Sequence, residues 1–351
     1  MTTVSRKELK QLLKSFHEAL EYWAKSLETK KSMEEIKSAQ VSDPLDELTK
    51  LSKLIKAHVT KVGIIFKPDI LQKQVESSYN TLQKLSESNV LLISLAAQLD
   101  PNQLSRIFYD EIIDRIKQIL LSNTYLVQQL MIIEKTIEAN DDGEQVPVSP
   151  LEETDGRLVS VGKIWSCCDG LAKVVADGKI GVLNSKFRQS IDLIEDGLED
   201  FAEWVENPEA FDDEDPFGFT DDEESDEDDG ATPPETDENK QELKDYGKLW
   251  LARFKLVRLL LTSISKSLPS VTSGDTINII YQAQKAIVSN VDKLIVDLMM
   301  SSRIDADTES YAGEITRNCR NLIKVVRDVN KSNEAKVKWC DTWDTKFNKP
   351  T

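Results

Sequence analysis

The amino-acid sequence predicts an all-α protein made of two antiparallel helical bundles. The chain has 351 residues, 40% of them hydrophobic, which is enough apolar surface for one large or two ordinary domains. Only 13 Gly and 11 Pro are present, and most of the Gly lie between Gly143 and Gly247, so the remaining sequence contains few helix breakers. No useful stretch alternates apolar and polar residues as a strand does.

The first bundle is expected over residues 1–140 and to contain four helices. In the first helix, apolar side chains recur every three or four residues and therefore share one face: Leu9, Leu12, Phe16, Leu20, Trp23 and Leu27. An Asp-Pro pair opens the second and the fourth helix, because Asp caps a helix and Pro fits its first position. These three further helices are expected over 45–66, from 68 to about 99, and from 101 to the end of the bundle.

A polar stretch with two prolines, residues 141–155, is predicted to link this bundle to a second one over residues 156–351. Helical periodicity resumes there and is interrupted at Ala176-Asp177-Gly178, where we expect a turn. The helices predicted in the second bundle cover 157–175, 180–206, 240–267, 276–302 and 306–330, followed by a shorter one that contains Trp339 and Trp343.

Residues 207–239 are predicted to form a long disordered acidic loop inside the second bundle. The formal net charge is −18, and 22 of the 62 Asp and Glu lie between Glu195 and Glu238, a window without Lys or Arg. The loop contains no Val, Leu or Ile, so it cannot bury enough apolar area to offset the entropy of ordering. Both a solvated linker and an interaction tail remain open interpretations.

The acidic loop contains two kinds of candidate site. Ser225 and Thr220 are followed by runs of Asp and Glu, the pattern that acidophilic kinases accept, and a phosphate there would deepen the negative field. Phe217 and Phe219 stand among the acids and are candidate anchors, either on the chain's own bundle or in a partner's groove. We therefore predict Ser225 and Thr220 as modification sites and Phe217 and Phe219 as contact residues.

The sequence offers no visible basis for catalysis or for a cofactor. His17 and His58 are the only histidines, each lies in a predicted amphipathic helix, and neither has a Cys or His at metal-binding spacing. There is no Walker-A loop and no dinucleotide-binding glycine pattern. We expect a chain without enzymatic activity, cofactor, metal or small-molecule substrate; an enzyme with an unrecognised helical site is the remote alternative.

Protein partners are favoured over nucleic acid and over membranes. Without the acidic window the chain has 44 basic and 40 acidic residues, and it shows no basic stripe of the kind duplex binding needs. No segment is apolar and long enough to cross a bilayer or to resemble a signal peptide, and the four cysteines do not form a disulfide framework. Most tryptophans are expected in the core, but Trp165 and Trp204 are candidates for lining a groove that receives a partner helix.

Residues 157–206 resemble the central block of the cyclin-D-binding protein family, also called the Grap2 and cyclin-D-interacting family. The resemblance lies in Val161-Gly162-Lys163-Ile164-Trp165-Ser166-Cys167-Cys168-Asp169, in Asp177-Gly178-Lys179-Ile180-Gly181-Val182-Leu183, and in Phe187 through Glu206 leading into the acidic loop. Residues Val59 through Phe66 look like a helix from the family's first half.

This resemblance implies a helical two-bundle protein without enzymatic activity, akin to the modules of catenin- and talin-like proteins. Members of the family bind D-type cyclins and helix-loop-helix transcription factors, dampen cell-cycle progression or transcription, and occur in cytoplasm and nucleus. Their binding surfaces carry no signature motif, so the resemblance assigns no contact residue. A cytoskeletal or trafficking adaptor of the catenin and talin kind is the alternative function, suggested by architecture alone.

Overall fold

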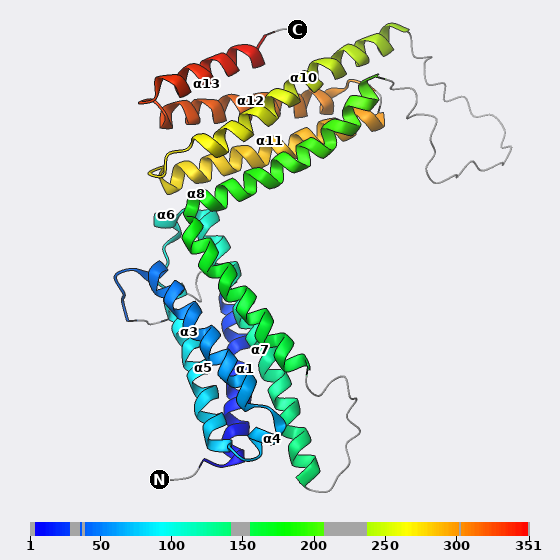
Figure 1. Cartoon of the computed structure of the whole chain (residues 1–351). Coiled ribbons are helices and arrows are strands. Elements are labelled where there is room, and N and C mark those ends of the chain that lie inside the picture. Colours follow the sequence, from blue (N-terminus) through cyan, green and yellow to red (C-terminus); the bar gives the residue numbers. More distant parts are fainter. Residues whose placement is uncertain are drawn as a thin grey trace, which may run out of the picture. The chain divides into compact units, whose positions relative to one another are not determined.

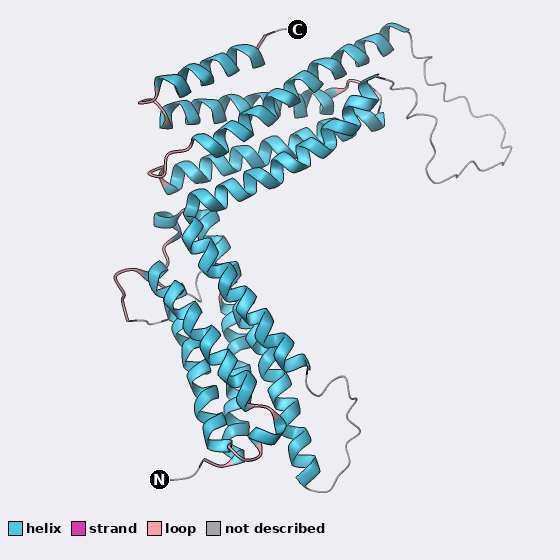
Figure 2. Ribbon diagram, viewed as in Figure 1, coloured by secondary structure: helices cyan, strands magenta, loops and turns pink. Residues whose placement is uncertain are grey.

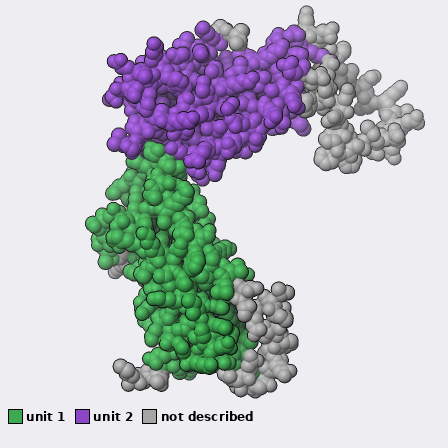
Figure 3. Space-filling model, viewed as in Figure 1, with its two compact units in different colours: residues 1–182 green, residues 183–351 purple. Residues whose placement is uncertain are grey.

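The computed structural model describes residues 4–28, 36, 39–141, 155–206, 237–301 and 303–349. Every regular element in these ranges is a helix, which confirms the predicted all-α class (Figure 2). The chain divides into two compact units, residues 1–182 and 183–351, coloured separately in Figure 3. None of the described helices is long and apolar enough to span a membrane.

Unit 1 is a bundle of long helices connected by two single-turn helices (Figure 1). The long helices are α1 (Arg6–Ser26), α3 (Pro44–Ile65), α5 (Val75–Ala96) and α7 (Arg106–Asp141). The long helix α8 (Asp155–Glu206) belongs to unit 1 as far as Val182, and this is called its first part. The short helices are α4 (Pro68–Leu71) and α6 (Pro101–Leu104). Of the predicted stripe, Leu9, Phe16, Leu20 and Leu27 are buried, whereas Leu12 and Trp23 are half-buried and Leu13 joins the core in addition.

The long helices of unit 1 close into a ring, and α8 completes it. Along the ring α3 packs on α5, α5 on α1, and α1 on α7. Helix α8 bridges back to α3 through an ion pair in which Lys56 Nζ lies 2.6 Å from Asp169 Oδ1. It also contacts α7, where Ser122 Oγ lies 3.6 Å from Cys167 Sγ. The first bundle therefore contains a fifth helix in addition to the four that the sequence predicts.

The division between the units lies at Val182, later in the chain than the predicted linker over 141–155. The predicted bounds 1–140 and 156–351 place the first part of α8 in the second bundle, whereas its contacts with α3 and α7 place it in the first. The predicted turn is present as a break inside α8, where Gly178 has φ 63° and ψ −173°. A left-handed φ is accessible to glycine at little steric cost, so a single residue interrupts the helix here.

Helix starts in unit 1 follow the capping residues of the sequence. Ser5 and Glu8 form a capping box at α1, and Asp43 accepts hydrogen bonds from two backbone N–H groups at the start of α3. Asp100 caps α6 by accepting one hydrogen bond, from the Asn102 N–H, but α6 ends after one turn because Ser105 has φ 104°. The helices predicted from 68 and from 101 are thus each broken near their start.

Unit 2 consists of the second part of α8 with α10 (Asp237–Ser267), α11 (Gly274–Ser301), α12 (Ala306–Val329) and α13 (Glu334–Phe347). Most of the predicted acidic loop lies outside the described residues, and its last three residues begin α10. Bulky aromatic side chains fill the core. The ring of Phe201 stacks on Trp204 at 5.4 Å and meets Phe254 edge-on at 5.5 Å. Such pairs stabilise a core beyond the area that they bury.

Helix α13 is fastened to the rest of unit 2 by buried aromatic side chains and by a part-buried hydrogen bond to α10. The rings of Trp343 and Phe347 stack at 4.7 Å, and both side chains are buried. The indole N–H of Trp343 donates to the Leu256 carbonyl of α10 at 2.9 Å. The C-terminal helix is therefore a part of the unit 2 core.

Candidate functional site

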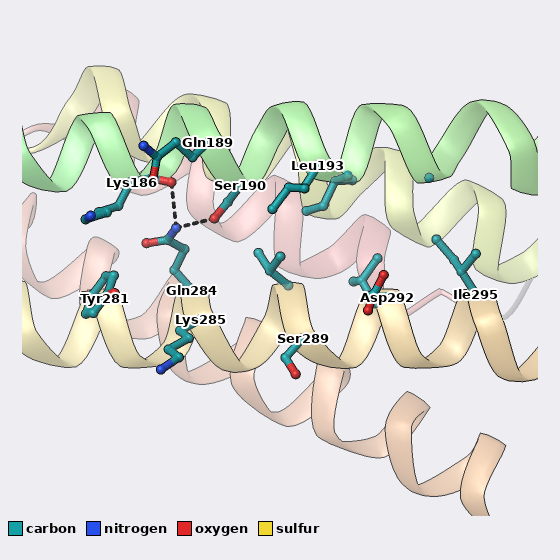
Figure 4. A pocket seen from close by; sticks show the side chains of 14 residues that line it. Lys186, Gln189, Ser190, Leu193, Tyr281, Gln284, Lys285, Ser289, Asp292 and Ile295 are labelled. Carbon is teal, nitrogen blue, oxygen red and sulfur yellow. Dashed lines mark hydrogen bonds between the residues drawn. The ribbon is translucent and has the colours of Figure 1, made fainter. Parts of the chain in front are cut away.

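A groove of about 480 Å³ runs between α8 and α11 in unit 2 (Figure 4). Its walls are two helix stripes whose residues recur every three or four positions, so that each stripe lies on one face of its helix. Helix α8 contributes Lys186, Gln189, Ser190, Leu193, Ile194 and Gly197, and α11 contributes Tyr281, Gln284, Lys285, Val288, Ser289, Val291, Asp292 and Ile295.

Gln284 joins the two walls near one end of the groove. Its Nε2 donates to the Lys186 carbonyl oxygen at 3.1 Å and to Ser190 Oγ at 2.6 Å (Figure 4). The side chain is 2% exposed, and among the described residues its Oε1 has no hydrogen-bond partner. A buried acceptor without a donor costs about 1–3 kcal/mol, so this amide oxygen is a destabilising feature of the groove wall.

The rest of the groove has an apolar floor and charged ends. Ile194, Val291 and Ile295 are nearly buried, whereas the Leu193 side chain is 64% exposed above them. Lys186 and Lys285 lie at one end with Tyr281, and Asp292 lies toward the other end (Figure 4). The two ends therefore differ in charge, which gives an elongated ligand a preferred direction.

The titratable groups of the groove lining are two lysines, one tyrosine and one carboxylate. The lining contains no histidine and no cysteine, and its single carboxylate, Asp292, has no second carboxylate beside it. In the part of the chain that the structure describes, no group of three or more His, Cys, Asp or Glu is placed to hold a metal ion. An apolar floor with an unsatisfied acceptor and charged ends suits the apolar face of a partner helix.

The two tryptophan candidates lie in different surroundings. Trp204 is fully buried in the unit 2 core, so no partner reaches its ring in this conformation. Trp165 lies on α8 in unit 1 and is 40% exposed, with the Lys56 ammonium 5.8 Å from its ring centroid. Leu158 and Val159, one or two turns earlier on the same helix, are also exposed. Trp165 is therefore available to a partner, and neither tryptophan lies in the α8–α11 groove.

The remaining sequence candidates are either outside the described residues or structural. Phe217, Phe219, Thr220 and Ser225 all lie in the undescribed segment 207–236.

Each histidine is paired. His17 Nε2 lies 3.0 Å from Gln128 Nε2, and His58 Nδ1 lies 2.8 Å from Ser88 Oγ. All four cysteines are free thiols, and burial raises the pKa of Cys168 to about 12. An un-ionised buried thiol is a poor nucleophile.

Leu193 and Gln284 distinguish the groove, and the sequence does not predict either as a functional residue. Leu193 is an apolar residue that falls off the buried stripe of its helix, which contains Phe187 and Ile194. Gln284 is a polar residue inside the buried stripe of α11, three residues before Ile287. Both exceptions to the periodicity are visible in the sequence, but which helix each one faces is decided by tertiary packing.

Comparisons with known proteins agree with the resemblance found in the sequence. Residues 47–207 match the family model described as Grap2 and cyclin-D-interacting, N-terminal. The chain is 24% identical over 352 residues to the uncharacterized protein YLR287C of Saccharomyces cerevisiae, covering 97% of this chain and 96% of that protein. It is 23% identical over 324 residues to the uncharacterized protein C22E12.18 of Schizosaccharomyces pombe, covering 88% and 87% respectively.

Proposed function

Since residues 47–207 match the N-terminal model of the Grap2 and cyclin-D-interacting family, we propose that this chain is a non-enzymatic protein-interaction module. It docks an amphipathic helix of a regulatory partner in the α8–α11 groove. The family name points to a cyclin as the partner, and a helix-loop-helix transcription factor is the second partner class. Regulation of the cell cycle or of transcription, in cytoplasm and nucleus, is the corresponding cellular role.

The observation that carries this proposal is the exposed Leu193 above the apolar floor of a groove that Gln284 also lines. A partner helix would cover Leu193 with its apolar face and thereby remove this surface from water. Its acidic residues would face Lys186 and Lys285, and its basic residues would face Asp292. The contribution of α8 to the groove lies within the residues that match the family model.

The acidic segment over 207–239 is the modulating part of this proposal. It follows α8 directly, and α8 forms one wall of the groove. Its negative charge favours partners with basic surfaces and repels acidic ones, and phosphate on Ser225 or Thr220 would strengthen both effects.

The experiment replaces Leu193 by Glu in the full chain and measures binding to a purified D-type cyclin and a purified helix-loop-helix protein. The new carboxylate would be buried against an apolar face, so we expect the affinity for the true partner to fall at least tenfold. Leu259→Glu on α10 is the matched control, because Leu259 is also an exposed leucine but does not line the groove. A third variant lacks residues 207–236.

The outcomes separate the possible surfaces. Loss with Leu193→Glu and retention with Leu259→Glu supports the groove. If Trp165→Ala abolishes binding while Leu193→Glu does not, docking takes place on unit 1 and the groove is excluded. Unchanged affinity without residues 207–236 would remove the modulating role of the acidic segment. Co-sedimentation with actin filaments, in the absence of binding to either partner, would favour the cytoskeletal adaptor instead.

A further inference from the structure

Unit 2 contains a second hollow, of about 590 Å³, between α10 and α12. It shares no lining residue with the α8–α11 groove. Its character is cationic and aromatic: the lining includes Tyr246, Trp250, Arg253, Glu309, Arg317 and Arg320. We name it the arginine pocket.

Arg253 is held in the arginine pocket by aromatic rings. Its guanidinium carbon lies 5.0 Å from the ring centroid of Trp250 on α10 and 5.9 Å from that of Phe347 on α13. A cation over aromatic faces is stabilised by the ring quadrupoles, and the flat guanidinium is thereby oriented before any ligand arrives. Trp250 and Phe347 are themselves buried, so this support is rigid.

The hydrogen-bonding capacity of Arg253 is unused within the described part of the chain. Its Nε is buried and has no acceptor, and no described residue accepts a hydrogen bond from its guanidinium or forms an ion pair with it. Burial is the main cause that lowers the pKa of Arg253; Tyr246 opposes this effect, and the positive charge of Arg320 adds to it. A half-buried guanidinium without a counter-ion is costly, because it has lost water and gained no anion in return.

Arg320 adds a second positive charge that no carboxylate neutralises directly. Its Nε donates to the Asn348 Oδ1 amide oxygen at 2.9 Å, and that acceptor is neutral. The third arginine, Arg317, is paired with Glu314 on the same helix. The charges of Arg253 and Arg320 repel each other, and neither arginine has a carboxylate partner. These two are therefore the pair available to bind an anion.

The charge balance of the arginine pocket fits a doubly charged anion. Arg317 is offset by Glu314, so the two positive charges without a carboxylate partner are those of Arg253 and Arg320, and the one carboxylate in the lining is Glu309. The negative charge of Glu309 helps to raise the pKa of Tyr246, so Glu309 lies near this tyrosine. Glu242 and Asp245 line a neighbouring hollow together with Tyr246, so the carboxylates gather at the Tyr246 end of the pocket. The opposite end, between Arg253 and Arg320, is where an anion meets the least repulsion.

We infer that the arginine pocket binds a phosphate group between Arg253 and Arg320. A phosphate monoester carries a charge of about −1.5 to −2 at pH 7 and three acceptor oxygens, whereas a carboxylate brings one charge and two oxygens. The guanidinium fork matches phosphate geometry in a bidentate manner, and the two terminal nitrogens of Arg253 supply that fork. The phosphate can belong to a phosphorylated side chain or be free in solution, and the experiment distinguishes these sources.

The test titrates the full chain, by calorimetry, with three peptides of one sequence that carry phosphoserine, glutamate or serine at the same position, and with inorganic phosphate. We expect the phosphoserine peptide to bind at least tenfold more tightly than the glutamate peptide, and the serine peptide to bind least. Arg253→Met keeps the apolar stem against Trp250 but removes the fork, and should weaken phosphoserine binding at least tenfold. The matched control is Arg258→Met on the same helix, because Arg258 pairs with Glu195 outside the pocket.

A phosphoserine preference lost with Arg253→Met and retained with Arg258→Met supports the arginine pocket. If inorganic phosphate binds as tightly as the phosphoserine peptide and depends equally on Arg253, the pocket is a site for the free ion. Equal losses in both variants, or equal binding of the glutamate and phosphoserine peptides, overturn the inference.

Arg320→Gln is the second variant if Arg253→Met does not fold, since Arg320 is exposed and its loss leaves the core intact. It should weaken phosphoserine binding several-fold, and an unchanged affinity would also overturn the inference. None of these results depends on the α8–α11 groove, because each uses the phosphate and residues outside that groove.

Discussion

Ser105 lies in a conformation that favours glycine. Among the described residues it is the one non-glycine residue with positive φ, at 104°, and it connects α6 to α7. Its side chain is buried, and Oγ has no hydrogen-bond partner among the described residues. A residue with a Cβ in such a region costs of order 1–3 kcal/mol. The sequence could not reveal this break, because Ser carries no signal for a positive φ.

Replacing Ser105 by Gly should relieve this strain, whereas replacing it by Ala should not. We expect Ser105→Gly to be more stable than Ser105→Ala by about 1 kcal/mol, the reverse of the ordinary order of these residues in helical proteins. Urea unfolding followed by circular dichroism measures the difference, provided that both variants unfold with the same m value. An alanine variant at least as stable as the glycine variant would show that the backbone at residue 105 is unstrained.

For the helices, the sequence predicts well where each one begins and ends, but it predicts poorly which other helix each one packs against. The helices predicted over 45–66 and 306–330 occur at Pro44–Ile65 and Ala306–Val329, because prolines, caps and apolar stripes are local signals. An apolar stripe shows that a face is buried but not which helix buries it. The first part of α8 was therefore assigned to the second bundle, although it packs on α3 and α7. The same limit hid the α8–α11 groove.

Gly63 of α3 lies close against Val161 of α8. A Cβ placed on Gly63 would lie 2.8 Å from Val161 Cγ2, and Val has little rotamer freedom in a helix. Gly63→Ala should therefore destabilise unit 1 by about 1–3 kcal/mol, and Val161→Ala in the same chain should recover much of that loss.

The control for this pair is Gly162→Ala, the neighbour of Val161 on α8. A Cβ there meets no atom within 4 Å, so the substitution should stabilise the helix by about 0.5–1 kcal/mol. The measurement is thermal unfolding of Gly63→Ala, Val161→Ala, the double variant and Gly162→Ala. Additive effects of Gly63→Ala and Val161→Ala would mean that the two helices do not touch at these residues.

For the complete chain, the boundary between the two units after Val182 can be tested directly with fragments. A fragment of residues 1–182 contains all the helices of unit 1, whereas a fragment of residues 1–150 lacks the helix that closes the ring between α3 and α7. We expect the longer fragment to unfold cooperatively and the shorter one to expose apolar surface and bind a hydrophobic dye. Cooperative unfolding of both fragments would instead restore the predicted four-helix bundle over residues 1–140.

The charge distribution, by contrast, could be derived from the sequence without knowledge of packing. Counting Asp and Glu along the chain is enough to assign the acidity to one segment. The arginine pocket could not be found in this way, because Arg253, Arg320 and Phe347 come from three helices and converge only through the tertiary fold.

The closing role of α8 also governs when the first bundle can form during synthesis. Lys56 and Asp169, which join α3 to α8, are 113 residues apart in the chain. A ribosome that adds about 5–20 residues per second needs roughly 5–20 seconds to bring the second of them out after the first. Throughout that interval the apolar surface that α8 later covers remains exposed to solvent. The growing chain is therefore a natural client for a ribosome-associated chaperone.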